Sequence, residues 1–224
     1  MVRVGIDLVV FCAAEAEGMA ARSVQREPFG HLLCGRVHAT VGHLGGALCL
    51  TVAAGMTRKR LEKTLEAVME RFHPRLFINF GAAGVIAPDI EIGTPTLPRE
   101  VLSYTWPDLG IRGDIIECPL AAQLADLNPD LRVTRAGSCR REIRDHAVRD
   151  RLAQTLRLDT TDWETYTLAD ACRRARIPFL ALRCVTDHAD SQARSDYVEN
   201  AAAVLARGAS RLPELAARAL ELLH

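Results

Sequence analysis

The segment Arg75-Leu76-Phe77-Ile78-Asn79-Phe80-Gly81-Ala82-Ala83-Gly84 joins a short apolar run to a cluster of small residues. We predict a buried strand over residues 75–80 and a tight turn over residues 81–84. A second apolar run, Pro178–Val185, is followed at once by the polar residues Thr186 and Asp187. Strands that are apolar throughout occur in sheets that helices cover on both faces. The two segments therefore indicate an α/β fold.

Further strands and helices are predicted on either side of these segments. Val2–Phe11 is a β-branched apolar run that favours a buried strand. From Thr57 to Phe72 apolar residues recur at helical spacing, which predicts an amphipathic helix that Pro74 ends. Pro88–Pro129 is rich in proline and glycine and is predicted to form strands and loops. The remaining predicted elements are strands at Gly30–His38, at Gly46–Ala53 and near Leu158, and helices at Arg141–Leu156, at Trp163–Arg176 and from about Ser195 onward, the last kinked or divided by Pro213.

The chain of 224 residues has no internal repeat and no linker-like segment, so residues 1–224 are expected to form a single domain. Strands that alternate with helices favour a largely parallel or mixed sheet. The 28 basic and 28 acidic side chains give a formal net charge of zero. No overall electrostatic attraction to nucleic acid or to an anionic membrane is therefore expected.

The seven cysteines are scattered, without a CxxC pair and without zinc spacing to the seven histidines. This pattern predicts reduced, mostly buried thiols, as in a cytosolic protein. Arg3 and Asp7 interrupt the first apolar residues, which is unlike a signal peptide. The longest apolar stretch, residues 45–56, is shorter than the ~20 residues of a membrane-spanning helix. We therefore expect a cytoplasmic protein with no membrane insertion.

Acidic residues gather beside the ends of the predicted strands, where ligands bind in open α/β sheets. They form three pairs: Glu15 and Glu17, Asp162 and Glu164, and Asp187 and Asp190. Their convergence on several strand ends indicates a binding or catalytic site.

Each pair also has a purely structural explanation. Carboxylates such as Glu15 and Glu17 stabilise the first turn of a helix, and aspartates such as Asp162 and Asp187 are common N-caps. His188 beside Asp187 offers a conceivable metal site, although one histidine among carboxylates is more often a surface residue. The chain contains no GxGxxG, no P-loop and no GxSxG motif, which argues against a dinucleotide site, a nucleotide-triphosphate site and a serine hydrolase.

The strand ends resemble those of the purine nucleoside phosphorylase and nucleosidase superfamily, and most closely its hydrolytic branch, the methylthioadenosine/S-adenosylhomocysteine nucleosidases. The matching segments are 13–17 (AAEAE), 78–84 (INFGAAG) with Ile92-Gly93 downstream, 162–164 (DWE) and 177–190 (IPFLALRCVTDHAD). The resemblance implies an α/β fold, a single-domain three-layer sandwich with a mixed central β-sheet flanked by helices. It also implies a small-molecule nucleoside as partner, a homodimer or higher homo-oligomer, and no metal or organic cofactor.

The resemblance implies a role for each residue that matches the superfamily pattern. Asp187 would protonate the purine leaving group, and Glu17 would hold or activate the attacking water. Glu164 would bind the ribose hydroxyls, and Trp163 would pack under the sugar. A purine anion leaves slowly unless it is protonated, so Asp187 must hold a proton near neutrality although a free aspartic acid has a pKa of about 3.9. The further substrate-binding residues implied are Asp162, Ala14, Met56, Phe80, Ala83, Gly84 and Arg140.

The nucleophile is predicted to be water rather than phosphate. Phosphorylases of this superfamily place glycine and arginine after the first strand, and a serine or threonine in the glycine-rich segment, as phosphate ligands. Glu15, Glu17 and Ala82 occupy those places here. A carboxylate repels phosphate and accepts hydrogen bonds from water. Arg58 or Arg60 nevertheless remains a candidate phosphate contact.

Two departures from the superfamily pattern leave the base open. Ala82 stands in place of a serine, and the segment Gly137–Arg141 offers arginine where these enzymes stack a phenylalanine on the purine. The expected function is hydrolysis of the N-glycosidic bond of a purine nucleoside modified at the ribose 5′ position, of the methylthioadenosine, adenosylhomocysteine, futalosine or adenosylhopane type. A phosphate-dependent phosphorylase and a non-catalytic nucleoside-binding protein are the alternatives.

Overall fold

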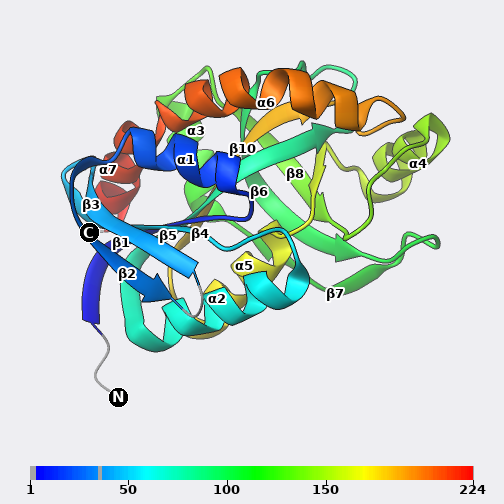
Figure 1. The fold of residues 1–224 in the computed structure, drawn as a ribbon. Helices are drawn as coiled ribbons and strands as arrows, with labels where there is room; N and C mark the ends of the chain where they lie inside the picture. The colour runs from blue at the N-terminus through cyan, green and yellow to red at the C-terminus, as the bar shows by residue number, and fades with distance from the viewer. Residues whose placement is uncertain (1–3, 35–36, 224) are drawn as a thin grey trace.

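A computed structural model of the chain describes residues 4–34 and 37–223. The strands in these ranges form one mixed, ten-stranded sheet, which crosses the middle of the molecule in Figure 1. At its centre, β1 (Val4–Cys12) pairs in parallel with β4 (Ala47–Ala53) on one side and with β5 (Phe72–Val85) on the other. All three strands therefore end at the same edge of the sheet.

Beyond β5 the sheet closes on itself. β5 pairs in parallel with β10 (Phe179–Asp187) and antiparallel with β9 (Thr160–Asp162). β6 (Pro95–Tyr104) and β8 (Arg132–Ser138) complete a closed ring, because β10 pairs with β6, β6 with β8 and β8 with β9. This closure adds to the predicted open sheet a small barrel-like half.

Outer strands extend both halves of the sheet. β2 (Arg26–Cys34) and β3 (Val37–Leu44) continue it antiparallel beyond β4, and β7 (Ile111–Glu117) lies on the outside of β6. The prediction of one strand over Gly30–His38 is therefore wrong. That range spans the end of β2 and the start of β3, with residues 35 and 36 outside the described residues.

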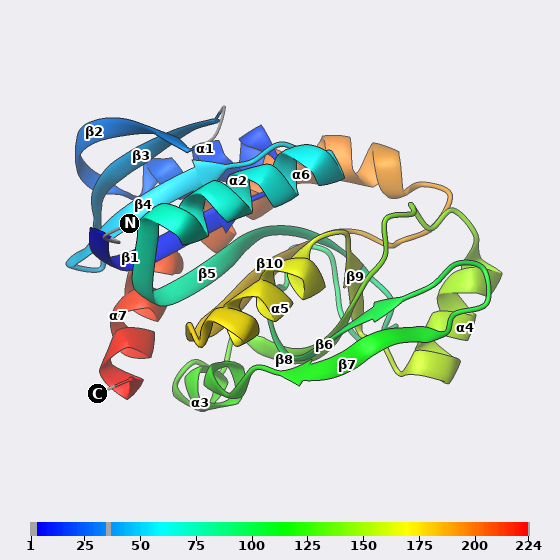
Figure 2. The ribbon, with the colours of Figure 1, turned by 90° about the horizontal axis from the view of Figure 1, so that it is seen from below.

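Helices cover both faces of the sheet, which confirms the predicted three layers. Figure 1 shows α1 and α6 side by side on one face, and Figure 2 shows α2 and α5 on the opposite face. Each face has its own hydrophobic core: Phe80 and Leu182 belong to the first, Phe77 and Ala181 to the second. The helices are α1 (Glu15–Ser23), α2 (Arg58–Arg71), α3 (Pro119–Leu127), α4 (His146–Leu156), α5 (Thr165–Ala175), α6 (Ala193–Ala209) and α7 (Leu212–Leu222).

The predicted helix over Thr57–Phe72 is confirmed as α2, but Pro74 does not mark its end. The chain enters β5 at Phe72, so the proline lies inside the strand. The predicted turn over residues 81–84 is also wrong, because all four residues belong to β5 and pair with β10. Residues this small leave space beside the strand, and that space is used by the site described below.

Elsewhere the predicted elements hold with shifted bounds. The predicted helix over Arg141–Leu156 begins only at His146, because Asp145 Oδ1 accepts a hydrogen bond from the Ala147 backbone N–H at 2.8 Å and caps α4 there. Pro213 lies in the first turn of α7, so the C-terminal helical region is divided into two helices rather than kinked. The seven cysteines are free thiols, and six of them are buried. None of the helices in residues 4–34 and 37–223 is both long and apolar enough to cross a bilayer.

Candidate active site

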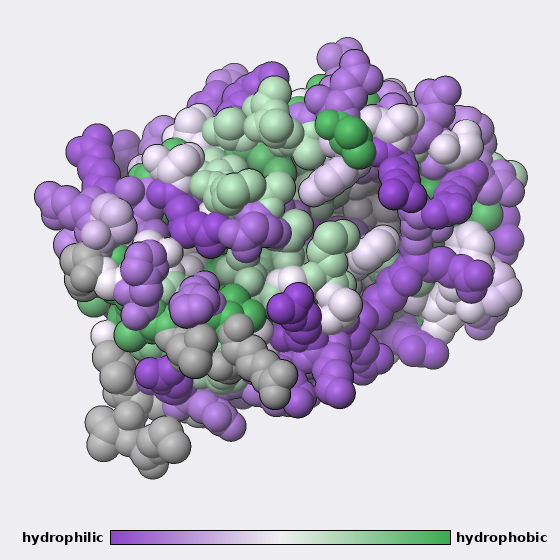
Figure 3. All heavy atoms as spheres, viewed as in Figure 1, coloured by the Kyte–Doolittle hydropathy of each residue, from purple (hydrophilic) through white to green (hydrophobic). Residues whose placement is uncertain are grey.

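A cavity of about 530 Å³ opens at the carboxyl ends of the parallel strands. It is visible as the hollow to the right of the centre of Figure 3. Its walls come from the segments that follow β1, β4, β8 and β9, from the ends of β5 and β10, and from the first turns of α6. The volume lies within the range of ~300–1,000 Å³ typical of small-molecule sites.

All but one of the predicted site residues line this cavity. The exception is Phe80, which is fully buried and packs in the core on the α6 face. Side chains alternate along a strand, so a residue beside the cavity in sequence can point away from it. The predicted residues that line the cavity are Ala14, Glu17, Met56, Ala83, Gly84, Arg140, Asp162, Trp163, Glu164 and Asp187.

Glu17 is held by three backbone N–H groups. Its Oε2 accepts hydrogen bonds from the N–H of Ala13 at 2.9 Å and of Ala14 at 2.8 Å, and its Oε1 accepts one from Ala82 at 2.8 Å. The first two bonds cap the start of α1, which is the structural role that a carboxylate in the first turn of a helix can have. The third bond joins α1 to β5, so the buried carboxylate also closes the cavity wall.

Arg183 lies at the floor of the cavity and is almost fully buried. Its Nη2 lies 2.7 Å from Glu164 Oε1, and its Nε lies 3.4 Å from Asp162 Oδ2. Its guanidinium also donates to the carbonyl of Ala82 and, at 3.2 Å, to Asn79 Oδ1. The guanidinium of Arg183 therefore links β10 to Asp162 at the end of β9 and to Glu164 just after it.

The charges at the floor do not balance. Glu17, Asp162 and Glu164 face the single positive charge of Arg183. Burial raises the pKa of Glu164, Arg183 opposes the shift, and the carboxylates of Asp162 and Glu17 add to it, with a net pKa of about 8. The empty cavity therefore favours the protonated form of Glu164 more than water does.

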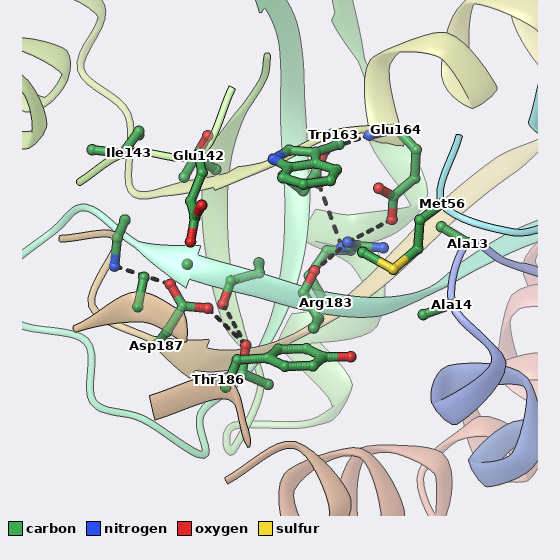
Figure 4. Close-up of a pocket in the computed structure, with 18 of the residues that line it drawn as sticks. Ala13, Ala14, Met56, Glu142, Ile143, Trp163, Glu164, Arg183, Thr186 and Asp187 are labelled. Carbon is green, nitrogen blue, oxygen red and sulfur yellow. Dashed lines mark hydrogen bonds and ion pairs between the residues drawn. The ribbon is translucent and has the colours of Figure 1, made fainter. Parts of the chain in front are cut away.

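Asp162 positions the start of α5 beside the cavity. Its Oδ1 accepts hydrogen bonds from the Glu164 N–H at 3.1 Å, from the Thr165 N–H at 3.0 Å and from the Ser138 hydroxyl at 2.6 Å. These bonds make it the capping residue that the structural explanation predicts. Trp163 and Glu164, which follow it, project into the cavity, as Figure 4 shows.

Asp187 stands at the opposite end of the cavity from Glu164 (Figure 4). Its Oδ1 accepts a hydrogen bond from the Ala189 N–H at 3.0 Å, and its Oδ2 accepts one from the Thr186 hydroxyl at 2.9 Å. Burial raises the pKa of this carboxyl group above its ordinary value, and these two hydrogen bonds partly oppose the shift. The site thus favours the protonated acid more than water does.

Two glycines of β5 make room for the two acids. A methyl group on Gly81 would lie 2.5 Å from Glu17 Oε1, and one on Gly84 would lie 2.7 Å from Asp187 Oδ1. Both distances are too short for any side chain. The two glycines of the segment that was predicted to be a turn therefore leave one gap beside Glu17 and one beside Asp187.

Residues 7–221 match the sequence pattern that defines the phosphorylase superfamily. The chain belongs to the phosphorylase superfamily.

Solved structures with the same fold include enzymes that act on nucleosides. A mutant of the Helicobacter pylori 5′-methylthioadenosine nucleosidase with 5′-methylthioadenosine in its active site matches with a TM-score of 0.85 at 15% identity, over 95% of this chain and 98% of that one. The H. pylori futalosine hydrolase matches with a TM-score of 0.84 at 15% identity, over 94% and 97%. The Neisseria meningitidis 5′-methylthioadenosine/S-adenosylhomocysteine nucleosidase matches with a TM-score of 0.82 at 19% identity, over 95% and 99%. At these identities the likeness establishes the fold that this superfamily member shares with them.

Sequence reasoning missed several residues that line the cavity. Arg183 is the most important, and a signal was present, since it is the one charged residue inside the apolar run Pro178–Val185. Arg194, Tyr197 and Val198 line the cavity from α6. Their i, i+3 and i+4 spacing puts them on one helix face, but only the fold shows that this face meets the cavity.

No group of three or more histidine, cysteine or acidic side chains in the described residues is arranged to hold a metal ion. His188 in particular does not join Asp187 and Asp190 in such a cluster. Asp190 Oδ1 instead accepts a hydrogen bond from the Gln192 N–H at 2.8 Å, and its other oxygen lies 3.7 Å from Arg149 Nη1. The conceivable metal site is therefore a helix-capping arrangement.

Proposed function

We propose that the protein hydrolyses the N-glycosidic bond of a purine nucleoside modified at the ribose 5′ position and releases the free base. The observation that carries the proposal is the placement of Asp187 and of the pair Glu17 and Glu164 around one cavity. The nucleosidase and futalosine hydrolase folds of the solved relatives support it.

Asp187 is proposed to protonate the departing base. The glycosidic bond breaks while positive charge develops on the sugar, so the leaving purine needs a proton at the same time. Burial favours the neutral acid at this position. A carboxyl group whose pKa is raised toward the working pH is suited to general acid catalysis.

Glu164 and Glu17 are proposed to act at the sugar. Ribose hydroxyls that donate hydrogen bonds to Glu164 favour its ionised form, and its negative charge then stabilises the positive charge developing on the ring. Glu17 lies beside the backbone of Ala82, whose N–H donates a hydrogen bond to Glu17 Oε1. Its carboxylate is a fixed acceptor that can hold a water molecule by one of that water's O–H groups.

The surroundings of Glu17 favour water over phosphate as the nucleophile. Both oxygens of Glu17 are bound by backbone N–H groups, which removes these donors from any phosphate. Arg58, one of the two candidate phosphate contacts, is exposed and lies 2.5 Å from Glu62 Oε1. Arg60 lines a separate cavity together with His31 and His38. Arg183, the cation at the floor of the cavity, is already paired with Asp162 and Glu164.

Product analysis tests this proposal. Purified protein is incubated with a panel of adenine and hypoxanthine nucleosides carrying 5′-hydroxyl or 5′-methylthio groups, with and without inorganic phosphate, and the products are separated by chromatography. We expect free base and free ribose derivative in both conditions. Base release that requires phosphate, with ribose 1-phosphate as product, would identify a phosphorylase, and binding without any base release would identify a nucleoside-binding protein.

Nucleoside binding is expected to release about one proton at pH 7. Glu164 is protonated in the empty site because its pKa is about 8, and ribose hydroxyls that bind its ionised form lower that pKa. Affinity for a nucleoside should therefore rise between pH 6 and pH 8 and level off above pH 8. Calorimetric titration in two buffers of different ionisation enthalpy measures the proton release directly.

The Glu164→Gln variant should bind nucleoside without this proton release, since glutamine does not titrate. Glu66→Gln on α2, outside the cavity, is the matched control and should release as many protons as the wild type. Unchanged proton release in Glu164→Gln would show that another group supplies the proton.

Alanine at either glycine of β5 is expected to lower the rate of base release at least ~10²-fold, since displacing a reacting group by about 1 Å has effects of this size. The new methyl group of Gly81→Ala would displace Glu17, and that of Gly84→Ala would displace Asp187. Gly5→Ala in β1 is the matched control, because a methyl group there has no atom within 4 Å. Circular dichroism confirms that each variant is folded, and wild-type rates in both glycine variants would contradict the roles of the two acids.

A further inference from the structure

The rim of the cavity differs in charge from its floor. Acidic side chains dominate the floor, whereas the charged side chains that line the rim are mainly arginines. We call rim residues the charged residues of the lining that are exposed or half-buried after β8 and on α6, namely Arg140, Arg141, Glu142 and Arg194, whereas Glu17, Asp162 and Glu164 at the floor are buried. Glu142 is already neutralised, since its Oε2 accepts hydrogen bonds from Arg144 Nε at 2.9 Å and from Arg144 Nη2 at 2.6 Å. Arg141 lies over the ring of Trp106, 5.8 Å from its centroid.

Arg140 and Arg194 are exposed and have no acidic partner within 4.0 Å among residues 4–34 and 37–223. They lie on different elements, so the cavity mouth has one free guanidinium on the loop after β8 and one on α6. Burial and the positive charge of Arg58 lower the pKa of Arg140, and the carboxylates of Glu62 and Glu164 oppose the shift. Neither carboxylate forms an ion pair with Arg140, so its guanidinium can still pair with an anion on the ligand.

Tyr197 adds a third free donor. It lies one turn after Arg194 on the same face of α6, lines the cavity and is half-buried. Its hydroxyl has no hydrogen-bond partner in the described part of the chain. Burial raises its pKa, and the carboxylates of Glu17 and Glu164 raise it as well, against the opposing effect of Arg183. A neutral phenol there donates to an acceptor on the ligand.

We propose that Arg140, Arg194 and Tyr197 select nucleosides whose 5′ substituent carries a carboxylate or another compact anion. The inference rests on the proposed function, which puts the base at Asp187 and the ribose hydroxyls at Glu164. The 5′ carbon then leads away from both groups toward the mouth. Three unpartnered donors meet the substituent there, and an anionic acceptor satisfies them better than an alkyl group does.

The test compares three 5′-thioadenosine derivatives that differ only at the end of the 5′ chain: a 3-carboxypropylthio group, its carboxamide and a 3-aminopropylthio group. Base release is measured as kcat/KM, and binding is measured separately by calorimetry. We expect the wild type to prefer the carboxylate over the carboxamide about tenfold, since exposed ion pairs have modest individual energies. The ammonium compound should be the poorest of the three.

Arg194→Glu tests the assignment by charge reversal. The variant should lose the preference for the carboxylate and favour the ammonium compound, and the ratio of the two values within one protein is unaffected by a general loss of activity. Arg140→Gln should reduce the preference partly. Arg151→Gln on α4, outside the cavity, removes the same charge and should leave the ratio at its wild-type value. Raising the salt concentration should weaken the wild-type preference.

The two proposals can fail separately. Equal kcat/KM for carboxylate and carboxamide in the wild type would overturn the anionic substituent while the hydrolase stands. A preference that survives in Arg194→Glu would also overturn it. Carboxylate-dependent binding without base release from any compound would support the rim assignment and reject the hydrolase.

Discussion

Asp187→Asn is expected to bind nucleoside normally and to release the base ~10²–10⁴-fold more slowly than the wild type, the range typical of general acid–base catalysis. Asparagine keeps the shape of the side chain, and its amide oxygen can still accept the hydrogen bond from the Ala189 N–H. Its NH2 group then faces the Thr186 hydroxyl, whose oxygen can accept a hydrogen bond as well as donate one. It cannot deliver a proton to a leaving base. The loss should therefore appear in kcat, with little change in the dissociation constant.

The leaving group provides a decisive control for this prediction. A riboside with p-nitrophenolate as leaving group needs no protonation, so wild type and Asp187→Asn should hydrolyse it at similar rates. Asp190→Asn is the matched control variant, since Asp190 is also a buried aspartate but does not line the cavity. Equal losses on the purine nucleoside and on the activated riboside would indicate a positioning role for Asp187 instead of proton donation.

Arg183→Met is expected to lower the free energy of unfolding by about 3–5 kcal/mol, the cost of removing one partner from a buried ion pair. Arg183 is the cation to which Glu164 and Asp162 are paired. Without it, burial and the neighbouring carboxylates raise the pKa of Glu164 further. Ionising Glu164 at higher pH then costs stability, so the loss should be larger at pH 8 than at pH 5.

Urea unfolding at pH 5 and pH 8 measures this effect. Leu182→Met, at the neighbouring and equally buried position of β10, reports the cost of methionine in this strand and should stay below ~1.5 kcal/mol. Combining Arg183→Met with Glu164→Gln should recover part of the lost stability, because one uncompensated acid is then gone. A pH-independent loss would mean that packing, rather than charge, explains the destabilisation.

The elements that could be predicted from the sequence are those whose own residues show a clear pattern of apolar and polar positions. β1, α2, β10 and the C-terminal helices each have a continuous apolar run or a clear helical period. α3 was missed inside Pro88–Pro129, although Pro119 at its first position is a common helix start. β8 was missed because its sequence, RVTRAGS, has little apolar character, and it is stabilised by its neighbours β6 and β9.

The site could be predicted because strand ends converge in this fold class, which brought Glu17, Glu164 and Asp187 together from distant parts of the chain. Two errors have the same physical origin. Phe80 and the Gly81–Gly84 segment were interpreted from their position in sequence, whereas strand alternation and side-chain volume decide where they point and why they are small. The rim donors of α6 depend on tertiary packing alone, so no local signal identifies them.

The closed ring of β5, β10, β6, β8 and β9 has a consequence for how such a protein can diversify. In the parallel pairing of β5 with β10, Gly81 lies opposite Arg183 and Gly84 lies opposite Asp187. The backbone hydrogen bonds between these two strands therefore fix the distance between the two ends of the cavity. A strand without a free edge cannot slide against its neighbour. Insertions and substitutions in the surrounding loops are therefore free to change which molecules are admitted, while the carboxylates that we propose to react keep a constant separation.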